Sequence, residues 1–94
     1  MVPVVFFSKV GCPYCDKLEQ DLINMEIPFE KIIPLTEEIP ELKEMTKMTT
    51  FPMVYIGKEC IGGYSDFSNL IATNNLQNKI QENTGVAINI PLDF

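Results

Sequence analysis

Histidine, arginine and tryptophan are all absent from this chain of 94 residues. Without histidine, the chain has no Ser–His or Cys–His catalytic pair and no imidazole metal ligand. Without arginine, and with a formal net charge of −6, it lacks the clustered cations that nucleic acids require. These absences exclude histidine-dependent catalysis and argue against a nucleic-acid partner.

Long apolar runs and a cysteine framework are missing as well. No apolar run approaches the roughly 18 residues that would suggest a transmembrane helix. Residues 1–7 carry neither a basic leader nor a small-residue cleavage site, so we expect no secretory signal and no membrane partner. Three cysteines are too few for a disulfide scaffold. Their small number favours a reducing, cytoplasmic location for the protein. With 46% hydrophobic residues, we expect residues 1–94 to form one domain around one core.

The order of the apolar segments is typical of an α/β protein. Residues 2–7 form a continuous β-branched and aromatic run that suits a strand covered on both faces. Strands are predicted at 2–7, 29–34, 53–56 and 59–61, the last two forming a hairpin. Helices are predicted at 13–25 and 37–46, the second with Ile39, Leu42 and Met45 on one face, and residues 65–73 and 76–82 are predicted to form one or two more. Because a helix separates the first two strands, they should be parallel neighbours in a mixed four-stranded sheet.

A C-x-x-C motif lies at the start of the first predicted helix. One helical stripe, at spacings of three, four and three, is formed by Cys15, Leu18, Leu22 and Met25. Cys12 lies one turn earlier, at or just before the helix start, and Pro13 suits the first turn. We therefore expect Cys12 to be exposed and Cys15 to be partly covered.

This position has consequences for the chemistry of Cys12. The free N–H groups and the dipole of a helix N-terminus stabilise a thiolate, and such sites lower a cysteine pKa from about 8.5 to between about 3.5 and 7.5. Cys12 is thus predicted to be a nucleophile in thiol–disulfide exchange, with Cys15 near enough to attack a mixed disulfide on it. Two alternatives stay open: inert core cysteines, or half of a zinc site in a chain without histidine.

Three ordered motifs resemble those of the dithiol glutaredoxins, over about residues 2–83. Cys12-Pro13-Tyr14-Cys15 is similar to the family's active site, and Thr50-Phe51-Pro52 to its Thr-Val-Pro segment with a cis proline. Residues 61–66, Ile-Gly-Gly-Tyr-Ser-Asp, resemble its Gly-Gly-x-Ser-Asp glutathione-binding turn. The resemblance implies the thioredoxin-like fold, an α/β arrangement with a mixed four-stranded sheet flanked by helices.

The resemblance also implies a function, which is glutathione-dependent reduction of protein disulfides and glutathione mixed disulfides. Cys12 would be the nucleophile and Cys15 the resolving thiol. Glutathione is then the reducing co-substrate, with no bound cofactor and no metal. Its binding residues would be Lys9, Tyr14, Phe51, Pro52, Gly63, Ser65 and Asp66. The implied partners are disulfide-bonded or glutathionylated proteins, ribonucleotide reductase among them, and the implied state is a monomer.

Several of these binding roles have a simpler alternative. Phe51-Pro52 is also consistent with a plain turn before a buried strand. Lys9 is also consistent with a solvated lysine and Tyr14 with a ring on the first helical turn. Ser65 is interpreted as an N-cap of the following helix, with Asp66 free to pair with an amino group. Two other activities are carried as alternatives: a glutathione-ligated iron–sulfur carrier, which Pro13 disfavours, and a redoxin reduced by thioredoxin reductase.

The chain departs from the family pattern at several positions. Phe51 replaces the usual valine. Met48 and Thr49 stand where the family often has a basic or amide side chain, and Lys47 is the nearest substitute. Cys60 is interpreted as a packing residue, with regulatory oxidation as the alternative. The apolar residues 85–94 are consistent with a packed extension, an edge strand or a loose terminus.

Overall fold

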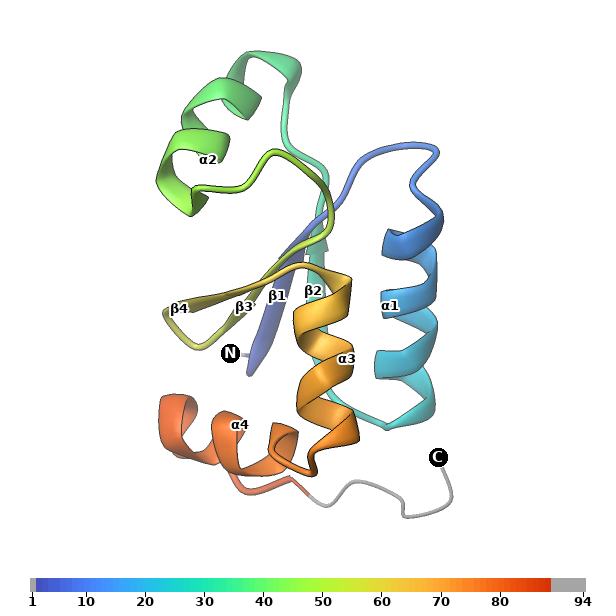
Figure 1. Cartoon of the computed structure of the whole chain (residues 1–94), viewed down its shortest axis with the longest axis vertical. Helices are drawn as coiled ribbons and strands as arrows, with labels where there is room; N and C mark the ends of the chain where they lie inside the picture. The colour runs from blue at the N-terminus through green and yellow to red at the C-terminus, as the bar shows by residue number, and fades with distance from the viewer. Residues whose placement is uncertain (1, 89–94) are drawn as a thin grey trace.

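A computed structural model describes residues 2–88 of the chain. Its centre is one mixed sheet with the strand order β2-β1-β3-β4 (Figure 1). The strands are β1 (Val4–Phe7), β2 (Phe29–Ile32), β3 (Met53–Ile56) and β4 (Glu59–Gly62). β1 and β2 are parallel, β1 and β3 are antiparallel, and β3 and β4 form an antiparallel hairpin. The predicted parallel pair and hairpin are both confirmed.

Helices cover the sheet. They are α1 (Pro13–Asn24), α2 (Ile39–Thr46), α3 (Tyr64–Ala72) and α4 (Leu76–Thr84), with a short 3₁₀ helix, η1 (Thr36–Glu38), before α2. α1 and α3 lie side by side over one face, α2 lies on the other side, and α4 packs against β3 and α3 (Figure 1). Among the described residues, no helix is long and apolar enough to cross a membrane.

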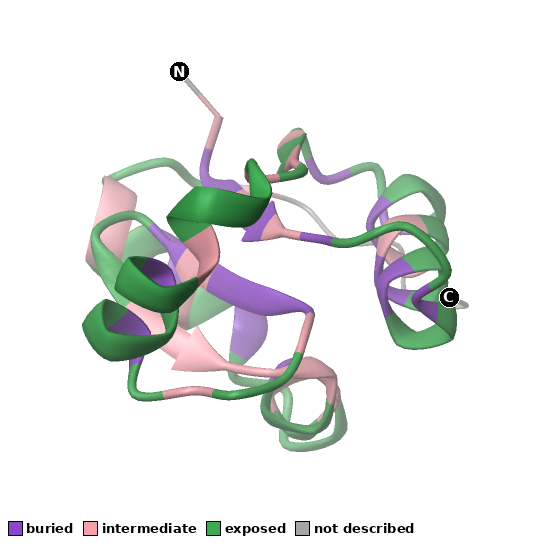
Figure 2. Cartoon of the chain, turned by 90° about the horizontal axis from the view of Figure 1, so that it is seen from above, coloured by how far each residue is buried: buried purple, intermediate pink, exposed green. Residues whose placement is uncertain are grey.

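The core is built where the apolar faces meet. All four residues of the predicted α1 stripe are buried, against Val4 and Phe6 of β1 and Phe67 of α3. Figure 2 shows the buried residues concentrated on the strands and on the inward sides of the helices. One face of β1 is fully buried and the other is half-buried, so its expected cover on both faces is incomplete.

The second helix ends at Thr46 as predicted, but its start and its buried face differ from the prediction. It begins at Ile39 rather than residue 37, because Thr36–Glu38 form the 3₁₀ turn η1. Met45, expected to be buried, is 61% exposed, and Thr46 is buried in its place. The Thr46 hydroxyl donates to the Leu42 carbonyl at 2.9 Å, so this polar side chain enters the core without an unsatisfied group.

Smaller differences concern strand and chain ends. β1 starts at Val4 and β2 ends at Ile32, both shorter than predicted. After α4, Gly85 ends the helix in a left-handed conformation and Ile88 packs against the core. This agrees with a packed extension as far as residue 88, whereas residues 89–94 of the tail lie outside the described residues.

Three connections converge at one end of the sheet. The chain leaves β1 at Phe7 and turns into the start of α1, and it enters β3 at Met53 from the preceding loop. It leaves β4 at Gly62 and turns at once into α3. Because β1 and β3 are antiparallel, with Phe7 paired to Met53, the end of β1 and the start of β3 lie together. These three connections carry the predicted functional residues.

Candidate active site

Cys12 is the N-cap of α1, and Pro13 is its first helical residue. An N-cap has a non-helical backbone, which Cys12 shows with φ −105° and ψ 103°. Its Sγ accepts a hydrogen bond from the backbone N–H of Cys15 at 3.2 Å. In this structure the two cysteines are joined by a disulfide, with Cα atoms 5.2 Å apart. The predicted redox pair is therefore assembled at the predicted helix start.

The expected exposure of Cys12 is wrong. Cys12 is only 5% exposed, and Cys15 is 1% exposed. The loop before β3 lies over the sulfur, because the Phe51 carbonyl oxygen is 3.8 Å from Cys12 Sγ. The helix pattern gave the face of α1 correctly, but it contains no information about this loop from the middle of the chain.

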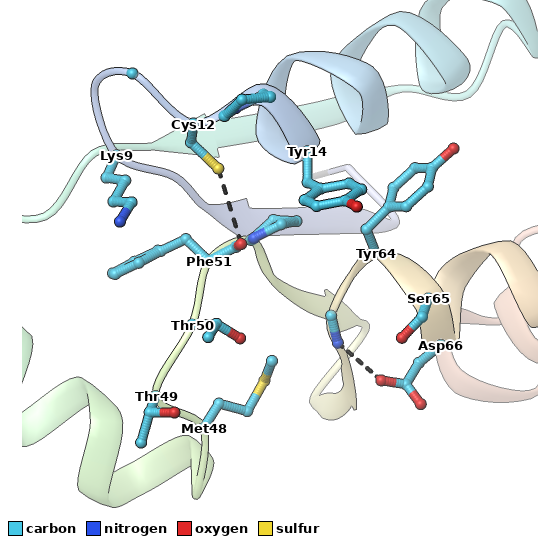
Figure 3. A pocket seen from close by; sticks show the side chains of 14 residues that line it. Lys9, Cys12, Tyr14, Met48, Thr49, Thr50, Phe51, Tyr64, Ser65 and Asp66 are labelled. Atoms are coloured by element: carbon cyan, nitrogen blue, oxygen red, sulfur yellow. Dashed lines mark hydrogen bonds between the residues drawn. The ribbon is translucent and has the colours of Figure 1, made fainter.

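The Phe51-Pro52 peptide bond is cis, as the family resemblance implied. Phe51 is half-buried against the core, and its main chain faces Cys12 (Figure 3). A backbone carbonyl beside a reactive sulfur can pair with the main chain of a peptide-like thiol. This segment therefore forms one wall beside the redox pair.

The turn between β4 and α3 forms the opposite wall. Gly62 has φ +117°, and a side chain added there would meet the Asp66 carboxylate. Gly63 is the N-cap of α3, and its N–H donates to Asp66 Oδ2 at 3.0 Å. The interpretation of Ser65 as the N-cap is wrong, because α3 already begins at Tyr64 and Asp66 supplies the capping carboxylate. Ser65 and Asp66 are both exposed.

A cleft of about 640 Å³ lies between the two walls (Figure 3). It brings together Cys12 and all seven residues predicted to bind glutathione, which are Lys9, Tyr14, Phe51, Pro52, Gly63, Ser65 and Asp66. Met48, Thr49 and Thr50 line it as well. Lys47, considered as a substitute for the family's basic residue, does not line this cleft. Cys15 lies beneath it, in the core.

Comparison with known proteins shows which family has these segments. The family model for glutaredoxins matches residues 4–61. Human Glutaredoxin-1 is 36% identical over 87 residues, covering 84% of this chain and 82% of the relative. The chain belongs to the glutaredoxin family.

Solved glutaredoxin structures agree with this assignment. The holo form of glutaredoxin C1 from Populus tremula x tremuloides is 28% identical, with a TM-score of 0.80, over 93% of this chain and 83% of that one. Wheat glutaredoxin is 30% identical, with a TM-score of 0.79, over 89% of this chain and 84% of that one. The predicted thioredoxin-like fold is thus confirmed.

As a glutaredoxin, the chain is a glutathione-dependent thiol–disulfide oxidoreductase, with Cys12 and Cys15 as its disulfide-forming pair. The local geometry fits this chemistry. A sulfur that accepts an N–H bond at a helix N-terminus is a better thiolate and a better leaving group than an ordinary thiol. Cys12 lines the cleft, so a partner approaches the sulfur from there.

Sequence reasoning missed the aromatic pair at the mouth of this glutaredoxin cleft. The rings of Tyr14 and Tyr64 are stacked, with centroids 5.7 Å apart and planes at 29°. The Tyr64 hydroxyl donates to Asp21 Oδ2 at 2.7 Å. Burial, and then the hydrogen bond and the negative charge of Asp21, raise the pKa of Tyr64 to about 12. The available signal was the helical spacing of residues 14, 17 and 21, which places them on one face of α1.

The third cysteine lies outside the redox pair. Cys60 on β4 is half-buried, and its Sγ is 4.0 Å from Met48 Sδ. This contact is consistent with the packing role predicted for it, although Cys60 touches a side chain of the cleft rather than the main core. Within residues 2–88, no group of three cysteine or carboxylate side chains is arranged to hold a metal ion.

Proposed function

We propose that Cys12 is the attacking thiol of this glutaredoxin and Cys15 its resolving thiol. The Cys12 thiolate attacks the glutathione sulfur of a glutathionylated protein. A Cys12–glutathione disulfide forms, and the protein thiol leaves as it takes up a proton. A second glutathione thiolate attacks this disulfide, which releases glutathione disulfide and regenerates the Cys12 thiolate.

Protein disulfides follow a second route in this proposal. Cys12 forms a mixed disulfide with one substrate sulfur, and the other substrate sulfur leaves as a thiol. Cys15 then attacks Cys12, releases the second substrate thiol and closes the Cys12–Cys15 disulfide. Two glutathione molecules reduce that disulfide and leave as glutathione disulfide, so the electrons balance. The disulfide between Cys12 and Cys15 is the oxidised state that this route requires.

The single observation that supports the proposal best is the position of Cys12 Sγ. It accepts the Cys15 N–H at the start of α1 and lies in the same cleft as Lys9 and Asp66. Cys15 is buried beneath the cleft, so an incoming disulfide meets Cys12 first. This asymmetry favours the two roles in the order proposed.

The walls of the cleft suit the parts of glutathione. The Lys9 ammonium is the complement of the glycyl carboxylate, and the main chain of Phe51 can pair with the central cysteine of the tripeptide. At the start of α3, the helix N–H groups and Ser65 suit the γ-glutamyl carboxylate, while Asp66 suits its amino group. Tyr14, Pro52 and Gly63 complete the contact surface.

The proposal extends to partners and setting. The substrates are glutathionylated or disulfide-bonded proteins, with ribonucleotide reductase as the candidate that the family resemblance offers. The proposed oligomeric state is a monomer, as the family resemblance implies. It works in the cytoplasm, where glutathione keeps thiols reduced.

A coupled assay tests the function. Reduction of a small glutathione mixed disulfide would be followed through the NADPH that glutathione reductase consumes. We expect turnover by the wild-type chain that depends on Cys12 and on added glutathione. Turnover with thioredoxin reductase but none with glutathione would contradict the proposal, and a coloured protein as purified would indicate an iron–sulfur cluster instead. The family assignment favours neither of these alternatives.

A further inference from the structure

One side chain of α3 lies across a stripe of α1. Tyr14, Lys17 and Asp21 are spaced by three and four residues, which places them on one face of the helix. Tyr64 contacts all three through different groups. Its ring stacks on Tyr14, the Lys17 Nζ is 5.4 Å from the ring centroid, and its hydroxyl donates to Asp21. Such a set of contacts fixes both the tilt and the depth of the ring.

This contact joins the two halves of the cleft. Tyr14 is two residues from Cys12, and Tyr64 is two residues from Asp66. The redox sulfur therefore belongs to the helix that presents Tyr14, and the capping carboxylate to the helix that presents Tyr64 (Figure 3). Any rotation of α3 relative to α1 would separate the rings and change the distance between the two halves.

The tyrosine between the two cysteines needs such support. Tyr14 is 61% exposed although it lines the cleft, and its described packing partner is the Tyr64 ring. A solvent-exposed aromatic side chain without a partner exchanges between rotamers, at a cost in ordering when a ligand binds. Held against Tyr64, the ring forms a fixed edge of the cleft before glutathione arrives.

We propose that Tyr64, anchored by Asp21, is a positioning residue that fixes the two halves of the cleft at the separation that glutathione requires. This inference rests on the proposed function, because it assumes that glutathione spans from Cys12 to the start of α3. Neither Tyr64 nor Asp21 supplies a reacting atom in the exchange. The pair acts on how well the substrate binds rather than on how fast sulfur is transferred.

The ionisation of Tyr64 supports the same arrangement. Burial and the nearby Asp21 raise the pKa of Tyr64 to about 12, so the hydroxyl stays protonated, and able to donate to Asp21, over the working range of a thiol enzyme. The nearest charges on the facing helix are Asp21 and Lys17, and Asp66 lies on its own helix. Burial contributes to the raised pKa as well, so removal of the Asp21 charge lowers this pKa without restoring its usual value fully.

Two substitutions separate the hydroxyl from the ring. Tyr64→Phe keeps the stack on Tyr14 and loses the hydrogen bond, and Asp21→Asn keeps a neutral acceptor and loses the charge. We expect each to raise the KM for a small glutathione mixed disulfide about three- to tenfold and to leave kcat within about twofold. Tyr55→Phe is the matched control, because Tyr55 is a partly buried tyrosine of β3 that lies outside the cleft.

A spectroscopic titration and an alkylation assay provide independent readouts. The chain has three tyrosines and no tryptophan, so ultraviolet absorbance follows tyrosinate formation directly. The absorbance step at the highest pH should be missing from the titration of Tyr64→Phe. In Asp21→Asn this step should occur at lower pH. The rate of Cys12 alkylation against pH should be unchanged in both variants, because the donors at the start of α1 are intact.

The outcomes distinguish the inference from the proposed function. A wild-type chain that fails to turn over the glutathione mixed disulfide would contradict the proposed function itself. If the wild type is active and the KM of Tyr64→Phe is unchanged, the positioning role is overturned. If Tyr64→Phe is less stable but its KM is unchanged, the contact serves only to pack α3 against α1. An altered alkylation profile would also overturn it, since the pair would then act on the thiol.

Discussion

The Asp66 carboxylate accepts a hydrogen bond from the N–H of Gly63 at 3.0 Å, so one side chain both caps α3 and faces the cleft. In the proposed complex with glutathione, the second oxygen of Asp66 binds the amino group of the ligand. Capping needs an acceptor oxygen, whereas recognition of an ammonium group needs a negative charge. The two roles can therefore be separated by a substitution that removes the charge alone.

Asp66→Asn should weaken glutathione handling far more than folding. The amide oxygen of asparagine can still accept from Gly63, but a charge-assisted contact worth about 1.5–3 kcal/mol is lost. This corresponds to roughly a tenfold or larger rise in the KM for glutathione. Steady-state kinetics would measure the change, with Glu82→Gln on α4 as the charge control outside this cleft. An unchanged KM would remove Asp66 from the binding site.

Gly62→Ala should damage the same wall through the backbone. Gly62 has φ +117°, and the added methyl group would run into the Asp66 carboxylate. Gly85 has φ +74° with no atom within 4 Å of an added Cβ, so Gly85→Ala reports backbone strain alone, at about 1–2 kcal/mol. We expect a greater loss of unfolding free energy in Gly62→Ala, measured by urea denaturation. Equal losses would show that the carboxylate moves aside freely.

Cys15→Ser should divide two activities that Cys12→Ser abolishes together. Deglutathionylation needs only the attack by Cys12, followed by external glutathione, so Cys15→Ser should retain it. Reduction of a protein disulfide by the dithiol route should fall steeply, because nothing releases the substrate from Cys12. Both activities would be assayed on both folded variants. Loss of deglutathionylation in Cys15→Ser with its retention in Cys12→Ser would reverse the two roles.

In the reduced protein, Cys12 should be alkylated by iodoacetamide faster than Cys60 at about pH 6–7, despite its lower exposure. The reason is the N–H of Cys15 and the helix start, which favour the thiolate of Cys12. Peptide mapping after short exposures would give the two rates separately. Cys12 modification that begins only above about pH 8 would identify an unperturbed thiol and contradict the assignment.

Stability should depend on pH through Glu59, which ties β4 to α4. Its carboxylate accepts hydrogen bonds from Asn83 and Lys79, and these contacts lower the pKa of Glu59 from the usual 4.5. A pKa that is lower in the folded state stabilises the fold above the unfolded value, and that contribution disappears as pH falls through the folded value.

The wild type should therefore exceed Glu59→Gln in unfolding free energy at neutral pH, with the difference vanishing as the pH falls below 4.5. Chemical denaturation at several pH values would show this. Glu41→Gln on α2 removes one exposed carboxylate elsewhere and controls for net charge. A difference that persists unchanged at low pH would assign the effect to side-chain packing rather than to ionisation.

Most of the fold could be predicted from local sequence patterns and from the order of the elements. The stripe from Cys15 to Met25 gave the buried face of α1, and the crossover helix gave the parallel pairing of β1 and β2. The start of α1 followed from Pro13, which needs no hydrogen-bond partner for its nitrogen. The face and the start of α1 depend on residues of the same helix, and the parallel pairing depends on the order of strand, helix and strand along the chain. A single sequence contains both kinds of information.

The wrong or missing predictions concern residues whose surroundings come from distant parts of the chain. Cys12 is covered by Phe51, which is 39 residues away, and Tyr64 is bonded to Asp21 across 43 residues. Thr46 replaces Met45 in the core because its hydroxyl reaches the Leu42 carbonyl and also contacts Met53 Sδ on β3. Helical periodicity ranks residues by their face, but it does not show which side chains a neighbouring element will accept.

The order of the cleft segments along the chain has a consequence for its synthesis. The residues around Cys12 come first, and the covering loop at 48–52 and the turn at 62–66 follow much later. A nascent chain thus carries both redox cysteines before it has either wall. The reactivity of Cys12 depends on the local start of α1, whereas selectivity for a partner depends on the two walls that fold around it later. Changes in the later segments can therefore redirect the enzyme to other thiols while the exchange chemistry stays intact.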